Sequence, residues 1–431
     1  MLVTDLADII SAADAGGFRI PRTVFYALVG AVAALVSFGF SLLIWKLSMK
    51  YRLYPKIRAR DVHTRPTPRL GGVAMFIGVI VAFAVASQLP TFSLVFAEPL
   101  KVFALLGSAL IIMLIGVADD IWDLDWVTKL AGQILAAGLL AWQVPLVSLP
   151  FIEGVAVVSP FMSLALTVLL VVLVMNAVNF IDGLDGLVAG VAIIANVVYF
   201  VYSYLLQLRG STDYFNLSTL ISVVVIGVCF GFLFLNWHPA KLFMGDAGAL
   251  LVGLLMAAST VAVSGQISPD EFTADRATLL PSLIPIVLPF AILLVPLLDF
   301  ALAIFRRLRA GKSPFTADRQ HLHHRLLDMG HSHLHAVLIL YAWTTVVALG
   351  CLGFMFLDTV PTLIILAVGL IICTVITLAP LSRRKRVEAA AQLASPDDAA
   401  APSPELDPLD VASTDSIRIP TSTTAKEKPA G

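Results

Sequence analysis

The fold of this chain is decided by residues 100–125, which read LKVFALLGSALIIMLIGVADDIWDLD. The first part, Leu100–Ala118, is an apolar run close to the roughly 20 residues that a membrane-spanning helix needs. It ends in two adjacent acids, Asp119 and Asp120, and further acids follow at once. Neighbouring carboxylates at a lipid boundary repel each other and are poorly solvated. We therefore expect a divalent cation or a cationic partner to neutralise them, with a merely acidic loop as the alternative.

The composition of the whole chain agrees with a membrane protein. Of its 431 residues, 59% are hydrophobic and 13% are charged, whereas soluble proteins average about 25% charged residues. The N-terminal segment carries acids before the first apolar run and has no basic region followed by a cleavage site, so no signal peptide is predicted. The three cysteines lie within apolar runs without a CxxC spacing and are predicted to be packing residues.

Hydropathy predicts an all-α polytopic integral membrane protein with about 11 transmembrane helices. Stretches of this length favour helices over barrel strands, which are segments of about ten residues with alternating hydrophobicity. The predicted spans are Thr23–Lys46, Leu70–Leu89, Leu100–Ala118, Trp126–Val144, Phe161–Val178, Leu184–Leu206, Leu217–Asn236, Ala247–Gly265, Leu279–Phe305, His335–Phe356 and Thr362–Leu378.

Basic residues indicate the orientation of the chain. They are concentrated in Lys50–Arg69, Arg306–Arg325 and Arg383–Arg386. Because positive charge favours the cytoplasmic side, the N-terminus is predicted to be outside and the C-terminus cytoplasmic.

The chain is therefore predicted to have three parts: an extracytoplasmic segment 1–22, a transmembrane domain 23–380 and a cytoplasmic tail 381–431. From Val387 onward the composition changes to Ala, Ser, Pro, Asp and Thr, which predicts disorder.

This orientation places all the polar motifs on one face. The predicted cytoplasmic loops are Tyr51–Arg69, Asp119–Asp125, Asn179–Gly183, Trp237–Asp246 and Arg306–His333. The outer loops, such as Pro145–Pro160, look like plain connectors. Incidental polar clusters would be divided between both faces, so we predict a single cytoplasmic site at the membrane surface.

Two cations in these motifs have both a functional and a structural interpretation. Arg65, in the loop before the second span, is suited to hold phosphate, and its alternative is a positive-inside anchor. Lys129 lies near the start of a span, where a lysine requires an anion or extends to the interface.

The acids after the fifth span form a second motif. Asn179, Asp182 and Asp185 are spaced three apart, although Gly183 and Gly186 predict a break in the helix. Polar groups around broken helices usually line a ligand cavity, and a structural cap would explain one of them.

The last motifs carry an acid and several imidazoles. Asp246 lies directly before a predicted span. It is suited to be a helix cap or, alternatively, a magnesium ligand beside substrate phosphates. His321, His323, His324 and Arg325 lack a nearby cysteine and a usual zinc spacing, which favours phosphate binding or proton handling. Acids, a metal and cations at one leaflet suit phosphoryl transfer with a lipid reactant.

These motifs together resemble the polyprenyl-phosphate N-acetylhexosamine-1-phosphate transferases, glycosyltransferase family 4. Those that carry the resemblance occur in the order of the family and are Pro66–Gly72, Asp119-Asp120 with Asp123, Asn176–Leu187, Pro239–Asp246 and His321–Leu326. With Gly330–His333, the chain resembles most closely the actinobacterial branch, which in mycobacteria uses decaprenyl phosphate to begin the arabinogalactan linker of the cell wall.

The resemblance implies a reaction. The phosphate of undecaprenyl or decaprenyl phosphate attacks the β-phosphorus of UDP-GlcNAc and gives polyprenyl-diphospho-GlcNAc and UMP, with Mg²⁺, or alternatively Mn²⁺, as cofactor. The catalytic residues implied are Asp119, Asp120, Asp246 and His321, with Asp246 and Asp120 at the metal. The substrate-binding residues implied are Arg65, Lys129, Asn179, Asp182, Asp185, Asn236, Phe243, His323, His324 and Arg325.

The partners expected are UDP-GlcNAc, the polyprenyl phosphate lipid and the bilayer of a bacterial inner membrane, with no nucleic acid and a homodimer as one candidate assembly. One alternative is a phospho-N-acetylmuramoyl-pentapeptide transferase, although Leu322 interrupts the three consecutive histidines of that group. Another is a transporter of a phosphorylated metabolite or cation, for which Asp299 is a solitary mid-bilayer acid.

Overall fold

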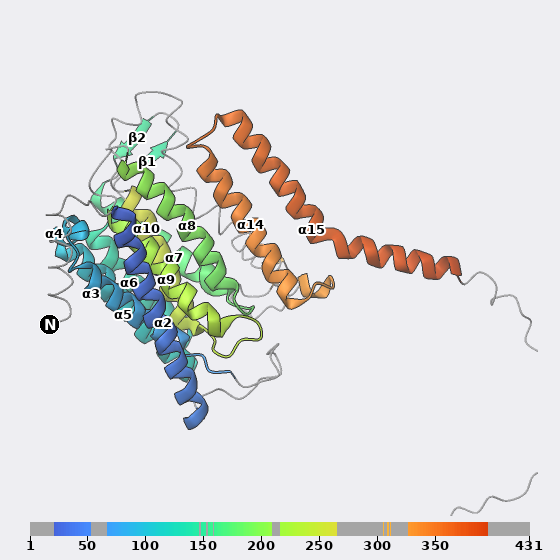
Figure 1. Ribbon diagram of the computed structural model, residues 1–431, viewed down its shortest axis with the longest axis horizontal. Helices are drawn as coiled ribbons and strands as arrows, with labels where there is room; N and C mark the ends of the chain where they lie inside the picture. The colour runs from blue at the N-terminus through green and yellow to red at the C-terminus, as the bar shows by residue number, and fades with distance from the viewer. Residues whose placement is uncertain are drawn as a thin grey trace, which may run out of the picture. The chain divides into compact units, whose positions relative to one another are not determined.

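The computed structural model describes residues 21–52, 67–145, 148–151, 154–157, 159–208, 216–264 and 326–394, with four isolated positions, 305, 308, 309 and 311 (Figure 1). The chain divides into two compact units, Met1–Leu381 and Ser382–Gly431. The first unit holds the helices that form the candidate site, and every structural statement below concerns the described residues.

The prediction of a helical, polytopic membrane protein is confirmed. Eight helices of the described part are long and apolar enough to cross a membrane. They are α2 (Arg22–Tyr51), α5 (Pro99–Trp122), α7 (Pro160–Ile181), α8 (Leu187–Leu208), α9 (Asn216–Asn236), α10 (Gly245–Ser264), α14 (His333–Gly353) and α15 (Thr359–Ala394). Each coincides with a predicted span.

Three predicted spans are not among these eight. In place of the second, α3 (Gly71–Ala86) has 16 residues and is followed by η1 (Pro90–Phe92) and α4 (Ser93–Ala97). The two segments form a pair bent by 99°, because Pro90 cannot continue the preceding hydrogen-bond pattern. The fourth is α6 (Trp126–Gln143), a helix that carries polar side chains, and Leu279–Phe305 lies outside the described ranges apart from its last residue.

The end of α5 corrects one prediction. Asp119 and Asp120 lie in the last turn of this helix, and not in a loop, because α5 continues to Trp122. It ends at Asp123, whose backbone is left-handed (φ 56°) and whose N–H bonds to the carbonyl of Asp119 at 2.9 Å. Asp125 then caps α6, since its carboxylate accepts the backbone N–H groups of the first helical turn. The four acids therefore have different structural settings.

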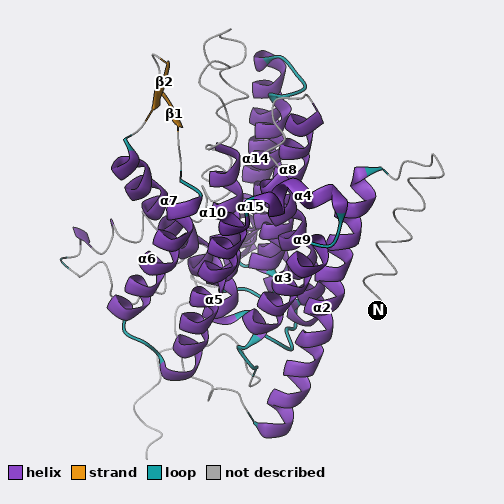
Figure 2. Cartoon of the chain, turned by 90° about the vertical axis from the view of Figure 1, so that its left-hand side faces the viewer, coloured by secondary structure: helices purple, strands orange, loops and turns teal. Residues whose placement is uncertain are grey.

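Helix α10 is the centre of the bundle. In its most apolar stretch of 18 residues, 94% of the residues are buried. The helix contacts α3, α5, α7 and α9 (Figure 2). Glycines allow some of these helices to approach its backbone directly. A Cβ at Gly72 would lie 2.2 Å from the backbone nitrogen of Gly248, and one at Gly116 would lie 2.2 Å from Cα of Ala247. The site residues that α10 carries are therefore fixed by backbone contact.

We expect Gly116→Ala to lower the free energy of unfolding by about 1–3 kcal/mol, because the added methyl group meets the backbone of α10. Gly138→Ala in α6 is the matched control, since nothing lies within 4 Å of its Cβ position. There alanine should be neutral or stabilising by up to about 1 kcal/mol. Thermal unfolding of both variants in detergent checks the difference, and equal effects would contradict the close packing.

Two further segments differ from prediction. The outer loop predicted to be a plain connector contains an antiparallel hairpin of β1 (Ser148–Phe151) and β2 (Gly154–Val157), with Ser148 opposite Val157. The tail predicted to be disordered from Val387 is helical as far as Ala394, the end of α15. Loss of apolar periodicity was a poor guide here, because VEAAAQLA is rich in strong helix formers. Residues 395–431 lie outside the described part.

Candidate functional site

Polar side chains from four helix ends meet at one end of α10. Nζ of Lys129, in the first turn of α6, lies 2.7 Å from Oδ2 of Asp119 and also contacts Oδ2 of Asp246. Asn179, in the last turn of α7, hydrogen-bonds to the Asp246 side chain. With Asp120, these residues are called the carboxylate cluster below. The anions predicted for Lys129 are therefore, in this structure, two carboxylates of the protein itself.

Asp120 holds the start of α10, which carries Asp246, in place. Its Oδ1 accepts the backbone N–H of Asp246 at 3.1 Å, and its Oδ2 accepts that of Ala247 at 3.4 Å. A carboxylate is favoured at a helix N-terminus by the free N–H groups and the helix dipole. Gly245, with φ of 69°, brings the chain close, since a Cβ there would lie 2.4 Å from Oδ2 of Asp120. Asp246 thus lies inside the first turn of α10, and the cap comes from α5.

The segment before α3 joins the same end of the bundle. The N–H of Phe243 donates to the carbonyl of Pro68 at 2.8 Å, and the N–H of Gly71 donates back to the carbonyl of Phe243 at 3.0 Å. Phe243 is thereby positioned two residues before α10 begins. The two segments meet closely, since a Cβ at Gly71 would lie 2.6 Å from the carbonyl oxygen of Phe243.

Asp182 lies in the connection between α7 and α8, where the predicted break is confirmed. Burial raises the pKa of this carboxyl to about 7, and the negative charges of Asp246 and Asp120 add to the shift, which Arg69 partly offsets. Asp182 is therefore within electrostatic reach of the carboxylate cluster and responds to any cation bound there.

The raised pKa of Asp182 predicts a pH dependence of stability. The folded state holds a proton that the unfolded chain, with a pKa of 3.8, releases, so this contribution is present below about pH 4 and is lost as the pH rises to about 7. Without divalent metal, we expect the unfolding temperature to fall between about pH 5 and pH 7, and Asp182→Asn to flatten that fall. Thermal unfolding of the two proteins checks this, and identical slopes would contradict it.

Asp185 and Asn236 are buried, each 5% exposed. Asn236 joins two connections, because its Oδ1 accepts the N–H of Gly186 at 2.9 Å and its Nδ2 donates to the carbonyl of Leu242 at 3.0 Å. Oδ2 of Asp185 lies 2.7 Å from Nδ1 of His238. In this structure both predicted substrate-binding residues hold neighbouring segments in place.

Sequence reasoning missed His238 and His333 as site residues. His333 opens α14, and its ring stacks on that of His238 with centroids 4.3 Å apart. His333 ends the Gly330–His333 motif of the family resemblance. His238 lies in the predicted loop Trp237–Asp246, one residue before the segment Pro239–Asp246 that carries the resemblance. Their contact joins segments far apart in sequence, so no local pattern revealed it. Arg65, His321, His323, His324 and Arg325 lie outside the described residues.

Two donor sets in this region differ in the metal they suit. The aspartates of the carboxylate cluster offer hard oxygen atoms, which Mg²⁺ prefers. Asp185, His238 and His333 bring one oxygen and two ring nitrogens within 4.8 Å of one another, a set of the type that binds zinc and similar ions. The donors of the carboxylate cluster are therefore of the type that suits Mg²⁺, and those of the second set are of the type that suits zinc.

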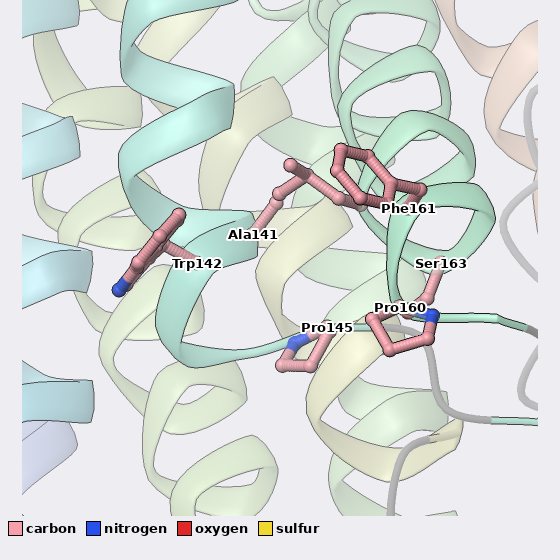
Figure 3. A pocket seen from close by; sticks show the side chains of 7 residues that line it. Ala141, Trp142, Pro145, Pro160, Phe161 and Ser163 are labelled. Carbon is pink, nitrogen blue, oxygen red and sulfur yellow. The ribbon is translucent and has the colours of Figure 1, made fainter.

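An apolar pocket of about 430 Å³ lies elsewhere, between the end of α6 and the start of α7 (Figure 3). Its lining includes Trp142, Pro145 and Phe161. Lys129 is at the other end of α6, twelve residues from Ala141, a separation of about 18 Å along a helix. The pocket is therefore about the thickness of a leaflet away from the carboxylate cluster.

Comparison with known proteins finds one matching family and relatives whose names describe related transferases. A family model described as Glycosyl transferase family 4 matches residues 102–264. The chain is 42% identical over 364 residues to the decaprenyl-phosphate N-acetylglucosaminephosphotransferase of Mycolicibacterium smegmatis, covering 83% of this chain and 89% of the relative. The Mycobacterium leprae protein of that name matches at 42% over 366 residues, 83% of this chain and 91% of the relative. A probable undecaprenyl-phosphate N-acetylglucosaminyl 1-phosphate transferase of Bacillus subtilis is 32% identical over 330 residues, 75% and 82% of the two chains.

Proposed function

The chain belongs to glycosyl transferase family 4, and from this we propose that it transfers GlcNAc-1-phosphate from UDP-GlcNAc to a membrane polyprenyl phosphate. The products are polyprenyl-diphospho-GlcNAc and UMP, in a first membrane step of cell-wall polysaccharide synthesis. The names of the relatives at 42% identity favour decaprenyl phosphate as the acceptor. The single structural observation that carries the proposal is the bridge that Lys129 makes between Asp119 and Asp246 at the helix ends.

The carboxylate cluster fits a magnesium ion. The predicted ligands are Asp246 and Asp120, but both oxygens of Asp120 accept backbone N–H groups of α10. We therefore propose that Asp246 and Asp119 would hold the ion. The ion, when bound, supplies positive charge that offsets the charge of the diphosphate. Mn²⁺ has the same preference for oxygen ligands and is the alternative.

The protein groups around this position have separate roles. Lys129 supplies a positive charge to an arriving phosphate, and its place between two carboxylates fixes the ammonium group. Asp119 lies at the end of a span where a lipid headgroup would arrive, so the ion that it helps to hold would lie within reach of the lipid phosphate. Asn179, bonded to Asp246, fixes the rotamer of that carboxylate.

The proposed location is a bacterial inner membrane, with the site on the cytoplasmic face, the N-terminus outside and the C-terminus inside. The ends of α5 and α7 and the starts of α6 and α10 supply the cluster, which agrees with one site at one surface. The basic segments that flank the spans support a cytoplasmic location for this surface. A homodimer stays a prediction.

Parallel assays of two nucleotide donors test the function. Purified protein with decaprenyl phosphate and Mg²⁺ should release UMP from UDP-GlcNAc and form the lipid-linked sugar, and it should leave UDP-muramoyl pentapeptide unchanged. Turnover of the pentapeptide alone would assign the chain to the muramoyl-pentapeptide transferases. Substrate flux into sealed proteoliposomes, with no UMP formed from either donor, would identify a transporter.

A further inference from the structure

A second polar cluster lies beside the carboxylate cluster and consists of Asp185, His238 and His333. The two stacked rings of His238 and His333 are called the imidazole pair below. Oδ2 of Asp185 lies 2.7 Å from Nδ1 of His238 and also accepts the backbone N–H of Ala240 at 3.1 Å. The three residues come from the connection between α7 and α8, the connection between α9 and α10, and the start of α14. Nothing in the proposed mechanism uses this arrangement.

The burial of Asp185 fixes the orientation of His238. The Asp185 side chain is 1% exposed, whereas that of His238 is 41% exposed. A buried carboxylate requires hydrogen-bond donors, so Nδ1 of His238 carries the hydrogen of this bond. Nε2, on the far side of the ring, is then directed away from Asp185, and in the described part of the chain no hydrogen bond engages it. The ring therefore offers one nitrogen to a ligand.

His333 fixes the plane of that ring. The two imidazoles stack with centroids 4.3 Å apart and an angle of 18° between their planes. Nε2 of His333 accepts the backbone N–H of Asp185 at 3.0 Å, so the same residue also anchors the segment that carries the carboxylate. An aspartate that holds one imidazole nitrogen while the other faces a substrate is the arrangement that orients histidine in many enzymes.

The geometry opposes a metal ion at the imidazole pair, despite the short distances between its ligand atoms. A ring nitrogen binds a metal along its lone pair, which lies in the plane of the ring, at about 2.0–2.1 Å for zinc. Nearly parallel rings direct their lone pairs along parallel planes and not to one point. The lone pair of His333 Nε2 is also already occupied by the N–H of Asp185.

The imidazole pair borders the carboxylate cluster. Asp182 precedes Asp185 by three residues, and the charges of Asp246, Asp120 and Asp185 all raise its pKa. His238 lies on the connection that leads directly into α10 and Asp246. A nucleotide whose diphosphate lies at the carboxylate cluster therefore brings negative charge close to the oriented imidazole of His238.

We propose that Nε2 of His238 binds a phosphate oxygen of the nucleotide substrate, with Asp185 and His333 as its positioning residues. This inference rests on the proposed function and adds a nucleotide-binding residue to it. When the imidazole is protonated, its Nε2–H donates a charge-assisted hydrogen bond to the phosphate. The bond between Nδ1 and Asp185 fixes the direction in which that hydrogen points.

Binding of UMP and of uridine to the full chain in detergent tests the inference. In His238→Asn the amide nitrogen takes the place of Nδ1 and keeps the bond to Asp185, but Nε2 is lost; in His238→Gln the amide nitrogen reaches the place of Nε2. We expect His238→Asn to weaken UMP binding by about tenfold or more and to leave uridine binding unchanged, with His238→Gln in between.

His335→Asn is the matched control, because this exposed histidine bonds only to Ser332 within the described residues. Its UMP affinity should equal that of the wild type. Wild-type UMP affinity in His238→Asn would overturn the inference, and so would an equal loss for UMP and uridine. Stoichiometric zinc in the wild type that His333→Asn abolishes would also overturn it. Turnover by the wild type is measured in parallel, so a protein that releases no UMP contradicts the proposed function and not this assignment.

Discussion

Asp246→Asn is expected to lower Mg²⁺-dependent release of UMP by at least about 10³-fold, while the protein stays folded. The carboxylate of Asp246 meets Lys129 and Asn179 at the start of α10. Asparagine has the same shape, and the backbone N–H of residue 246 keeps its bond to Asp120, so the helix start is preserved. What is lost is the negative charge, which a magnesium ion and Lys129 both require.

The measurement for Asp246→Asn is UMP release over a range of Mg²⁺ concentrations, together with thermal unfolding. Asp358→Asn is the control, since this exposed acid lies before α15 and outside the carboxylate cluster. It should keep the wild-type rate. A near-normal rate for Asp246→Asn at saturating Mg²⁺ would remove the metal role from Asp246.

Lys129→Met is expected to lower activity by about 10²-fold and to make stability depend more strongly on Mg²⁺. The ammonium group lies between Asp119 and Asp246, and the three side chains are only 10–28% exposed. Without it the two partly buried carboxylates repel each other, which lowers the unfolding temperature in the absence of metal. A divalent cation at these carboxylates removes the repulsion. Mg²⁺ should therefore raise the unfolding temperature of Lys129→Met more than that of the wild type.

Thermal unfolding with and without Mg²⁺ checks this second expectation. Lys101→Met is the matched control, because Lys101 pairs with Glu98 near the surface, at 2.6 Å, where an ion pair contributes about 0–1 kcal/mol. Its response to Mg²⁺ should be that of the wild type. An equal rise in the wild type and in Lys129→Met would show that the ion does not bind between Asp119 and Asp246.

The helices could be predicted from the sequence because each span is a long apolar run, but their ends could not be placed by hydropathy alone. Asp119 and Asp120 are polar and still helical, since a helix ends where its backbone bonds stop and not where its apolar residues stop. Asp123, with its left-handed backbone, marks that point. The bend before Pro90 likewise shortened a span that hydropathy extended to Leu89.

The convergence of the motifs could also be predicted, but not the partners of individual side chains. Asp120 bonds to a residue 126 positions away and Asp185 to one 148 positions away. Such contacts depend on how α5, α10 and α14 pack, which no local pattern records. A single sequence therefore indicated which acids lie in the site, but not that Asp120 caps a helix or that Asp185 orients an imidazole.

The central helix α10 has a consequence for how this enzyme can change. Backbone contacts at Gly72 and Gly116 leave no room for even one added carbon atom, so a larger residue at either position would displace the backbone of α10 beside Asp246. We therefore expect substitutions that change substrate preference without displacing α10 to lie in the connections around this helix, such as the one that carries His238. Relatives with another nucleotide donor or lipid acceptor should then differ in these connections and keep the glycines that pack against α10.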